Sequence, residues 1–171
     1  MAKYFNISGE LTQQLLAPGE NFNVSKISLT NVQKVSKCKV DLYIEKTLTG
    51  KFYLLKGVEL PIGATLIYDD IAFSNASGQF GLYIKLTDGA SFTMTGSIDV
   101  TGTNTNVPGT STLYTSELSV GDEIVVSGET RIIETITGDT TATVSAAWGS
   151  DLANDTSPDC NPTALVDVII N

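Results

Sequence analysis

Two adjacent pairs of acidic residues are the side chains of this sequence that come nearest to a catalytic or cation-binding arrangement. They are Asp69-Asp70 and Asp122-Glu123. Two carboxylates can act as the acid and base of a glycosidase, and several carboxylate oxygens can hold a calcium ion. Neighbouring residues of a strand point to opposite faces, however, so an adjacent pair converges only at a turn. We therefore expect solvated turn acids at both places.

Nucleophilic catalysis has little support in the composition. The sequence contains no histidine, so its serine and threonine hydroxyls lack the usual general base of a triad. The segment Val120-Gly121-Asp122 is explained by turn geometry, because glycine permits a positive φ and aspartate can bond to nearby backbone. The sequence thus predicts no catalytic, cofactor-binding or metal-binding residues, and a hydrolase that uses two carboxylates is a weaker hypothesis.

Aromatic residues and glycosylation patterns offer two further candidates. Tyrosines at the exposed parity of predicted strands, together with the single tryptophan, could form a sugar-stacking platform, although cross-strand tyrosines also pack in ordinary sheets. These residues are Tyr43, Tyr53, Tyr68, Tyr83 and Trp148. The N-glycosylation pattern occurs at Asn6, Asn23, Asn75 and Asn154. We expect none of these sites to be used, because MAKYFNISGE lacks the apolar core of a signal peptide.

The two cysteines, Cys38 and Cys160, lie far apart in the chain and have no metal-site spacing. We expect both to be buried free thiols, since a cytosolic site of synthesis keeps thiols reduced.

Charge and hydropathy exclude several classes of partner. The net charge is −9 and the pI is about 4.3, which disfavours nucleic acid and anionic membrane surfaces. No apolar run approaches the ~20 residues that span a bilayer. The hydrophobic fraction of 42% is that of a globular protein. We therefore expect a folded protein that is made in the cytoplasm and binds neither nucleic acid nor membrane.

The segment Cys38 to Lys46 has the clearest strand pattern, because apolar residues alternate with polar ones. It predicts a central strand with one face in the core. A turn at 47–50 leads into a second strand at 51–56, so these neighbours should be antiparallel. Asp88-Gly89 predicts another hairpin turn, and a change of parity near Ser25 and Lys26 predicts a β-bulge. About seven short strands before residue 97 indicate an antiparallel β-sandwich with little helix.

The composition changes near Gly96. Residues 97–162 contain ten acidic side chains against Arg131 alone, whereas the remaining residues balance nine acids with nine lysines. Three short β runs separated by glycine turns predict a meander or small barrel at 123–127, 131–137 and 141–146. The polar segment 151–162 resembles a linker in composition. We predict that residues 97–162 form an acidic small β domain.

The apolar run Leu165 to Ile170 predicts a buried strand that needs a sheet. Its character matches the first sandwich, so residues 1–96 and 163–171 should form one domain into which 97–162 is inserted. A tandem arrangement, in which the last strand belongs to the acidic domain, stays open.

The segment Thr115 to Val144 resembles a small β module that recurs in structural and tail-fibre proteins of tailed bacteriophages. The flanking motifs KISLTN, VDLYIEK, GATLIYDD and VDVIIN resemble a β-sandwich unit of small virion proteins in phages with contractile tails. The resemblance implies an all-β protein in which an immunoglobulin-like antiparallel β-sandwich carries the small β domain. It brings no catalytic residues.

Two functions follow as expectations. The first is a non-enzymatic virion component on the capsid, neck or tail, present in multiple copies or as a homo-oligomer. It would contact other virion proteins through the neutral sandwich and project the acidic domain. The second is a receptor-binding or polysaccharide-binding adhesin module of a tail fibre, in which loops and surface aromatics carry specificity.

Overall fold

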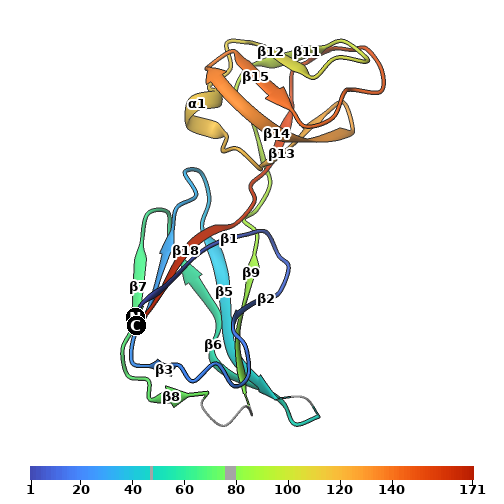
Figure 1. Cartoon of the computed structure of the whole chain (residues 1–171). Coiled ribbons are helices and arrows are strands. Elements are labelled where there is room, and N and C mark those ends of the chain that lie inside the picture. The colour runs from blue at the N-terminus through green and yellow to red at the C-terminus, as the bar shows by residue number, and fades with distance from the viewer. Residues whose placement is uncertain (47, 76–79) are drawn as a thin grey trace. The chain divides into compact units, whose positions relative to one another are not determined.

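The structure is a computed structural model that describes residues 1–46, 48–75 and 80–171 (Figure 1). It is nearly all β, which confirms the predicted fold class, and its only helix among the described residues is α1 (Tyr114–Glu117). That helix is too short to cross a membrane, and no other described segment is helical.

The chain divides into two compact units. Unit 1 comprises Met1–Gln33, Lys37–Asp88 and Ala164–Asn171, and unit 2 comprises Lys34–Ser36 and Gly89–Thr163. Whether residues 97–162 fold as an independent inserted domain stays a prediction.

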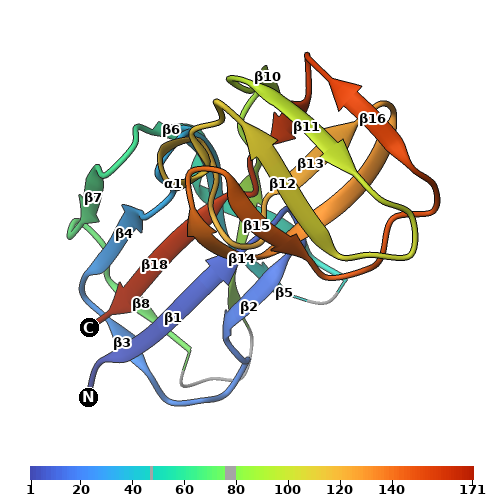
Figure 2. The same cartoon turned by 90° about the horizontal axis from the view of Figure 1, so that it is seen from above.

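The elements of unit 1 are β1 (Lys3–Ser8), β2 (Gln13–Leu16), β3 (Asn23–Val24), β4 (Ile27–Asn31), β5 (Cys38–Lys46), β6 (Gly50–Leu60), β7 (Thr65–Tyr68), β8 (Phe73–Ser74), β9 (Gly81–Thr87) and β18 (Leu165–Ile170). Unit 1 contains two four-stranded sheets. Sheet A has the order β1-β18-β4-β7 (Figure 2). Sheet B has the order β2-β9-β5-β6, and β3 pairs with β8. All these pairs are antiparallel.

Strand β18 lies inside sheet A although it follows all of unit 2 in the sequence. It pairs with β1 on one side and β4 on the other. A hydrogen bond links the segment that leaves unit 1 to the segment that re-enters it: the Ala164 amide donates to the Asp88 carboxylate at 2.7 Å. Asp88-Gly89 is therefore the passage from one unit to the other, and the predicted hairpin at this position is wrong.

The core of unit 1 lies between sheets A and B. Strand β5 buries Cys38, Val40 and Leu42 in this core, while Lys39 is exposed, as the alternation predicted. Strands β5 and β6 pair as predicted, and the turn predicted at 47–50 begins at Thr47, which lies outside the described residues. Strand β6 continues past Lys56 to Leu60. Register shifts in the β5–β6 pair accommodate the change in the alternation of side chains along the strand. Gly57 has a φ of +61° and donates its amide to the Asp41 carboxylate at 2.6 Å.

The predicted bulge near Ser25 and Lys26 is instead a break between strands. Strand β3 ends at Val24 and pairs with β8, whereas β4 starts at Ile27 and belongs to sheet A. The amides of Ser25 and Lys26 both donate to the Asn171 carbonyl. The parity changes here because the chain passes from one sheet to another.

The elements of unit 2 are β10 (Phe92–Thr93), β11 (Ser97–Val100), β12 (Asn106–Thr110), α1, β13 (Glu123–Val126), β14 (Glu129–Gly138), β15 (Thr141–Val144), β16 (Leu152–Asp155) and β17 (Asp159–Asn161). They form one sheet in the order β10-β17-β13-β14-β15-β12-β11-β16. The predicted meander is present in β13, β14 and β15, which pair in sequence. No pairing among the described residues joins β10 to β16, so the sheet is not a closed barrel.

The predicted linker at 151–162 is wrong. It contains β16, which pairs with β11, and β17, which pairs with β13. These strands contribute Leu152 and Cys160 to the core of unit 2, whose largest members are Trp148 and Tyr114. One or two apolar residues are enough to hold each of these polar strands in the sheet, because the neighbouring strands supply hydrogen-bond partners for its backbone.

Candidate docking surface

The outer face of sheet A carries a row of mostly apolar side chains. The strand registers align Tyr4 of β1, Ile169 of β18, Ser28 of β4 and Ile67 of β7. The neighbouring row Phe5, Val168, Leu29 and Leu66 packs in the core. Since successive side chains of a strand point to opposite faces, the row that contains Tyr4 points away from the core.

These outward apolar side chains are substantially exposed. Tyr4 is 72% exposed, Ile67 51% and Ile169 37%. Val32 directly follows β4, with its amide bonded to the Leu165 carbonyl, and is 45% exposed. Scattered surface apolar residues are ordinary, but here Tyr4 and Ile169 pair directly on neighbouring strands, and Ser28 alone separates Ile169 from Ile67 in the same row. We call the outward residues of sheet A the apolar face.

Four polar side chains on the apolar face form two hydrogen-bonded pairs. The Asn6 amide donates to the Asp167 carboxylate at 2.6 Å, and the Thr30 and Thr65 hydroxyls lie 2.9 Å apart. Among the described residues that the registers place on this face, Asp167 is the only charged one. Protein interfaces are depleted of charge at their centre, so this composition fits a surface that another protein covers.

The outer face of sheet B has the opposite character. Its registers alternate lysines with acids across the strands, namely Lys39, Asp41, Glu45, Lys51, Glu59 and Lys85. Ions of both signs remain solvated at low cost, whereas desolvating them is expensive. Of the two sheet faces in unit 1, the outer face of sheet A is therefore the better docking surface.

Three of the five predicted platform aromatics meet on the outer face of sheet B. The Tyr43 ring lies 5.7 Å from that of Tyr83 and 5.5 Å from that of Tyr53, measured between centroids. The Lys51 ammonium lies 4.4 Å from the Tyr43 ring centroid. Tyr43 is only 2% exposed, although it lies outside the core. The Tyr43 ring is thus covered by neighbouring tyrosines and a lysine, whereas Tyr53 stays 43% exposed.

The other two predicted aromatics lie elsewhere, which corrects the five-residue platform. Tyr68 is in β7 of sheet A, opposite Ile27, and Trp148 is buried in the core of unit 2. Parity in single strands could not show which tyrosines share a sheet.

The adjacent acids do not form a site. Asp69 and Asp70 are exposed, as predicted. Asp122 is fully buried, so its predicted solvation is wrong. Its carboxylate accepts amide hydrogen bonds from Ser119 at 2.7 Å and Thr163 at 2.9 Å, while Gly121 has the predicted positive φ of 95°. Among the described residues, no group of three or more cysteine and acidic side chains is placed to hold a metal ion.

Both cysteines are buried free thiols, which confirms that prediction. Burial, with a smaller contribution from Asp88, raises the pKa of Cys38 to about 11. Burial also raises the pKa of Cys160, and the nearby carboxylate of Asp122 adds to the effect. Neither thiol has the lowered pKa of a nucleophile. Of the glycosylation patterns, the one that starts at Asn75 extends into residues 76 and 77, outside the described residues.

No protein-family model and no curated protein matches this chain. Two solved structures have a low similarity to it. The PBSX exported protein XepA has a TM-score of 0.31 and 10% identity over 99% of this chain and 86% of its own. A serine protease of Aeromonas sobria has a TM-score of 0.25 and 9% identity over 100% of this chain and 26% of its own. At these TM-scores neither structure assigns a function to the chain.

Sequence reasoning did not find the apolar face. A signal for it exists in LVDVII, where Leu165 and Ile169 are apolar at the parity opposite to the buried Val166, Val168 and Ile170. Apart from Asp167, both parities of this strand are apolar, but only the alignment of four strands shows that one parity lies on the surface.

Proposed function

We propose that this protein is a non-enzymatic structural component that attaches to a larger protein assembly through the apolar face of sheet A. The observation that carries the proposal is the alignment of exposed apolar residues on a face where, among the described residues, Asp167 is the only charged one. A free monomer gains nothing from exposing such a row. Its burial against a partner contributes about 25 cal/mol for each Å² of apolar surface removed from water.

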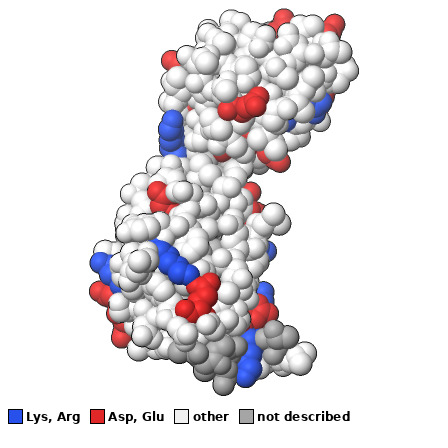
Figure 3. All heavy atoms as spheres, viewed as in Figure 1, with Lys and Arg blue, Asp and Glu red and all other residues white. Residues whose placement is uncertain are grey.

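The distribution of charge supports the same arrangement. Unit 2 contains ten of the nineteen acidic side chains and only two of the ten basic ones, Lys34 and Arg131. Figure 3 shows acidic side chains, in red, at the surface of unit 2. Arg131 is paired with Glu129 and also donates to backbone carbonyls, so it is committed within its own unit. An acidic unit in each of many copies would keep assembled particles apart and soluble.

The sequence resemblance supplies the finer part of the proposal. The assembly is the virion of a tailed bacteriophage, with the protein on the capsid, neck or tail in multiple copies. Its partners are other virion proteins, and it is made in the host cytoplasm. A structural role requires no cofactor.

A pair of matched charge insertions tests the docking surface. Ile67→Asp places a carboxylate on the apolar face, and Thr87→Asp places the same group on the outer face of sheet B, where Thr87 lies opposite Lys39. Both positions are exposed, so both variants should fold. Burying a carboxylate in an interface costs several kcal/mol, so Ile67→Asp should weaken docking by roughly a hundredfold or more. Thr87→Asp should have little effect.

The measurement is co-sedimentation of purified protein with phage particles that lack it, with electron microscopy to locate the bound copies. Docking through sheet A would be contradicted if both variants lost binding equally, or if neither variant lost binding. Full binding to host cells without any particle, together with no binding of the unmodified protein to particles, would instead support the adhesin.

A further inference from the structure

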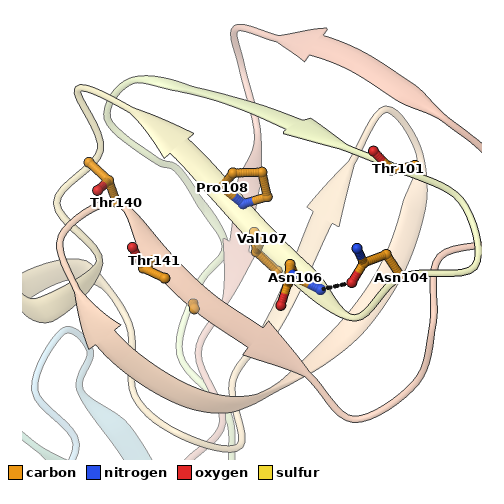
Figure 4. A pocket seen from close by; sticks show the side chains of 8 residues that line it. Thr101, Asn104, Asn106, Val107, Pro108, Thr140 and Thr141 are labelled. Atoms are coloured by element: carbon orange, nitrogen blue, oxygen red, sulfur yellow. Dashed lines mark hydrogen bonds between the residues drawn. The ribbon is translucent and has the colours of Figure 1, made fainter.

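Unit 2 contains a surface pocket of about 300 Å³ beside the β12–β15 pair (Figure 4). Its rim is formed by Thr101, Asn104, Asn106, Pro108, Thr140 and Thr141. Its remaining lining is Val107 and Ala142, whose side chains belong to the core of unit 2. The volume is at the lower end of the range for small-molecule sites, which suits one or two sugar rings.

The loop on one side of the pocket is fixed by backbone hydrogen bonds. The Trp148 carbonyl accepts from the Thr103 amide at 2.8 Å, and the Trp148 amide donates to the Asn104 carbonyl at 3.0 Å. Thr103 has a φ of +65°, a conformation that is uncommon for threonine. Because Trp148 is buried, it anchors this strained loop to the core. Backbone strain of this kind persists only where the surroundings impose it.

The opposite side is also held in place. The Gly109 amide donates to the Thr140 carbonyl at 2.9 Å, next to the paired residues Pro108 and Thr141. The Asn106 amide donates to the Asn104 side-chain carbonyl at 3.0 Å, which ties the loop to β12. The pocket is thus formed before a ligand arrives, which reduces the entropic cost of binding.

The chemistry of the lining selects a class of ligand. No charged side chain lines the pocket, so a carboxylate or phosphate would find no counter-ion there. Threonine hydroxyls and asparagine amides can both donate and accept hydrogen bonds, as a ligand rich in hydroxyl groups requires. Pro108, which is exposed, supplies apolar surface for the C–H face of a sugar ring. The excess of acidic residues in unit 2 further disfavours acidic sugars.

We propose that this pocket binds an uncharged sugar unit of a polysaccharide. The proposal goes beyond docking, because the pocket belongs to unit 2 and shares no residue with the apolar face. A docked copy would then also contact glycans.

Saturation-transfer NMR on the full chain provides the test, with maltotriose, cellotriose and chitotriose as neutral probes and trigalacturonate as the acidic probe. At least one neutral trisaccharide should receive transfer, and trigalacturonate should receive none. Thr141→Arg should abolish the signal, because Thr141 is exposed and lines the pocket, and the much larger arginine would occupy it. Asn106→Ala should weaken binding by about tenfold, since its side-chain amide is lost.

Thr110→Ala is the matched control, because Thr110 is exposed on the same strand but does not line the pocket. It should bind as the unmodified protein does. Absence of transfer to all three neutral probes overturns the proposal, as does unchanged binding by a folded Thr141→Arg variant or equal transfer to trigalacturonate. Ile67→Asp should leave sugar binding intact, so a failure of docking and a failure of sugar binding are separate results.

Discussion

Two neighbouring isoleucines in β18 provide a matched test of sheet A. Ile170 is fully buried in the core of unit 1, whereas Ile169 points outward and is 37% exposed. The substitutions Ile170→Ala and Ile169→Ala remove the same atoms from adjacent positions of one strand. Any difference between them reports which face of β18 is in the core.

The expected difference is large. Truncating a buried isoleucine to alanine costs about 2–5 kcal/mol, because the transfer free energy of the side chain is lost and a cavity remains. Ile169 retains water on one side, and its loss should cost about 1 kcal/mol or less. Against a total stability of roughly 5–15 kcal/mol, Ile170→Ala removes a large share of the stability of unit 1.

Equilibrium urea unfolding can assign this loss to a unit. Trp148 is the single tryptophan and lies in the core of unit 2, so its fluorescence reports that unit. Five of the six tyrosines belong to unit 1, so tyrosine circular dichroism in the near ultraviolet should report mainly on that unit. Ile170→Ala should lower the tyrosine midpoint and leave the tryptophan midpoint in place.

Two outcomes would refute this reasoning. If both variants lose the same stability, β18 does not present Ile170 to the core and Ile169 to solvent. If the tryptophan midpoint falls together with the tyrosine midpoint, the two units unfold as one and unit 2 is not an independent domain.

Three further predictions concern buried groups. Val40→Asp should unfold unit 1, since Val40 is fully buried and an unpaired carboxylate there costs several kcal/mol; a soluble variant with a cooperative thermal melt would contradict this. The stability of unit 1 should fall by at most ~2–3 kcal/mol as the pH rises above about 9, because the unfolded Cys38 thiol ionises near its ordinary pKa of 9.0 while the folded thiol stays protonated up to a pKa of about 11. Urea titrations at several pH values measure this loss, and Cys38→Val should reduce it. Asp122→Asn should destabilise unit 2 by about 1–3 kcal/mol, because an amide cannot accept at both oxygens from Ser119 and Thr163, and an unchanged tryptophan midpoint would count against this role.

Sequence patterns predicted those elements in which local pattern and burial agree. Strand β5 alternates because one face meets the core, and the run at β18 is apolar because the strand is central in its sheet. Strands β16 and β17 were missed, since their few apolar residues give no periodic signal and their stability comes from pairing with β11 and β13.

The candidate surface depends on register, which single strands do not encode. Tyr4 and Ile67 become neighbours on one face only through β18 and β4, which lie between them in sheet A. The burial of Tyr43 on an outer face likewise depends on the side chains of Tyr53 and Tyr83 from adjacent strands. Asp122 was misassigned because its partner Thr163 is distant in sequence.

The position of β18 has a consequence for biosynthesis. A ribosome that adds 5–20 residues each second needs roughly 4–15 s to make Gly89–Thr163, and only afterwards does it make the strand that joins β1 to β4. During that interval the edges of β1 and β4 that will pair with β18 are unpaired, while unit 2 can already fold behind them. Unpaired strand edges are prone to aggregation, and like charges on the emerging acidic segment oppose contact between nascent chains. The acidic residues of unit 2 would therefore reduce aggregation of the unfinished sandwich on the polysome as well as aggregation of the finished protein.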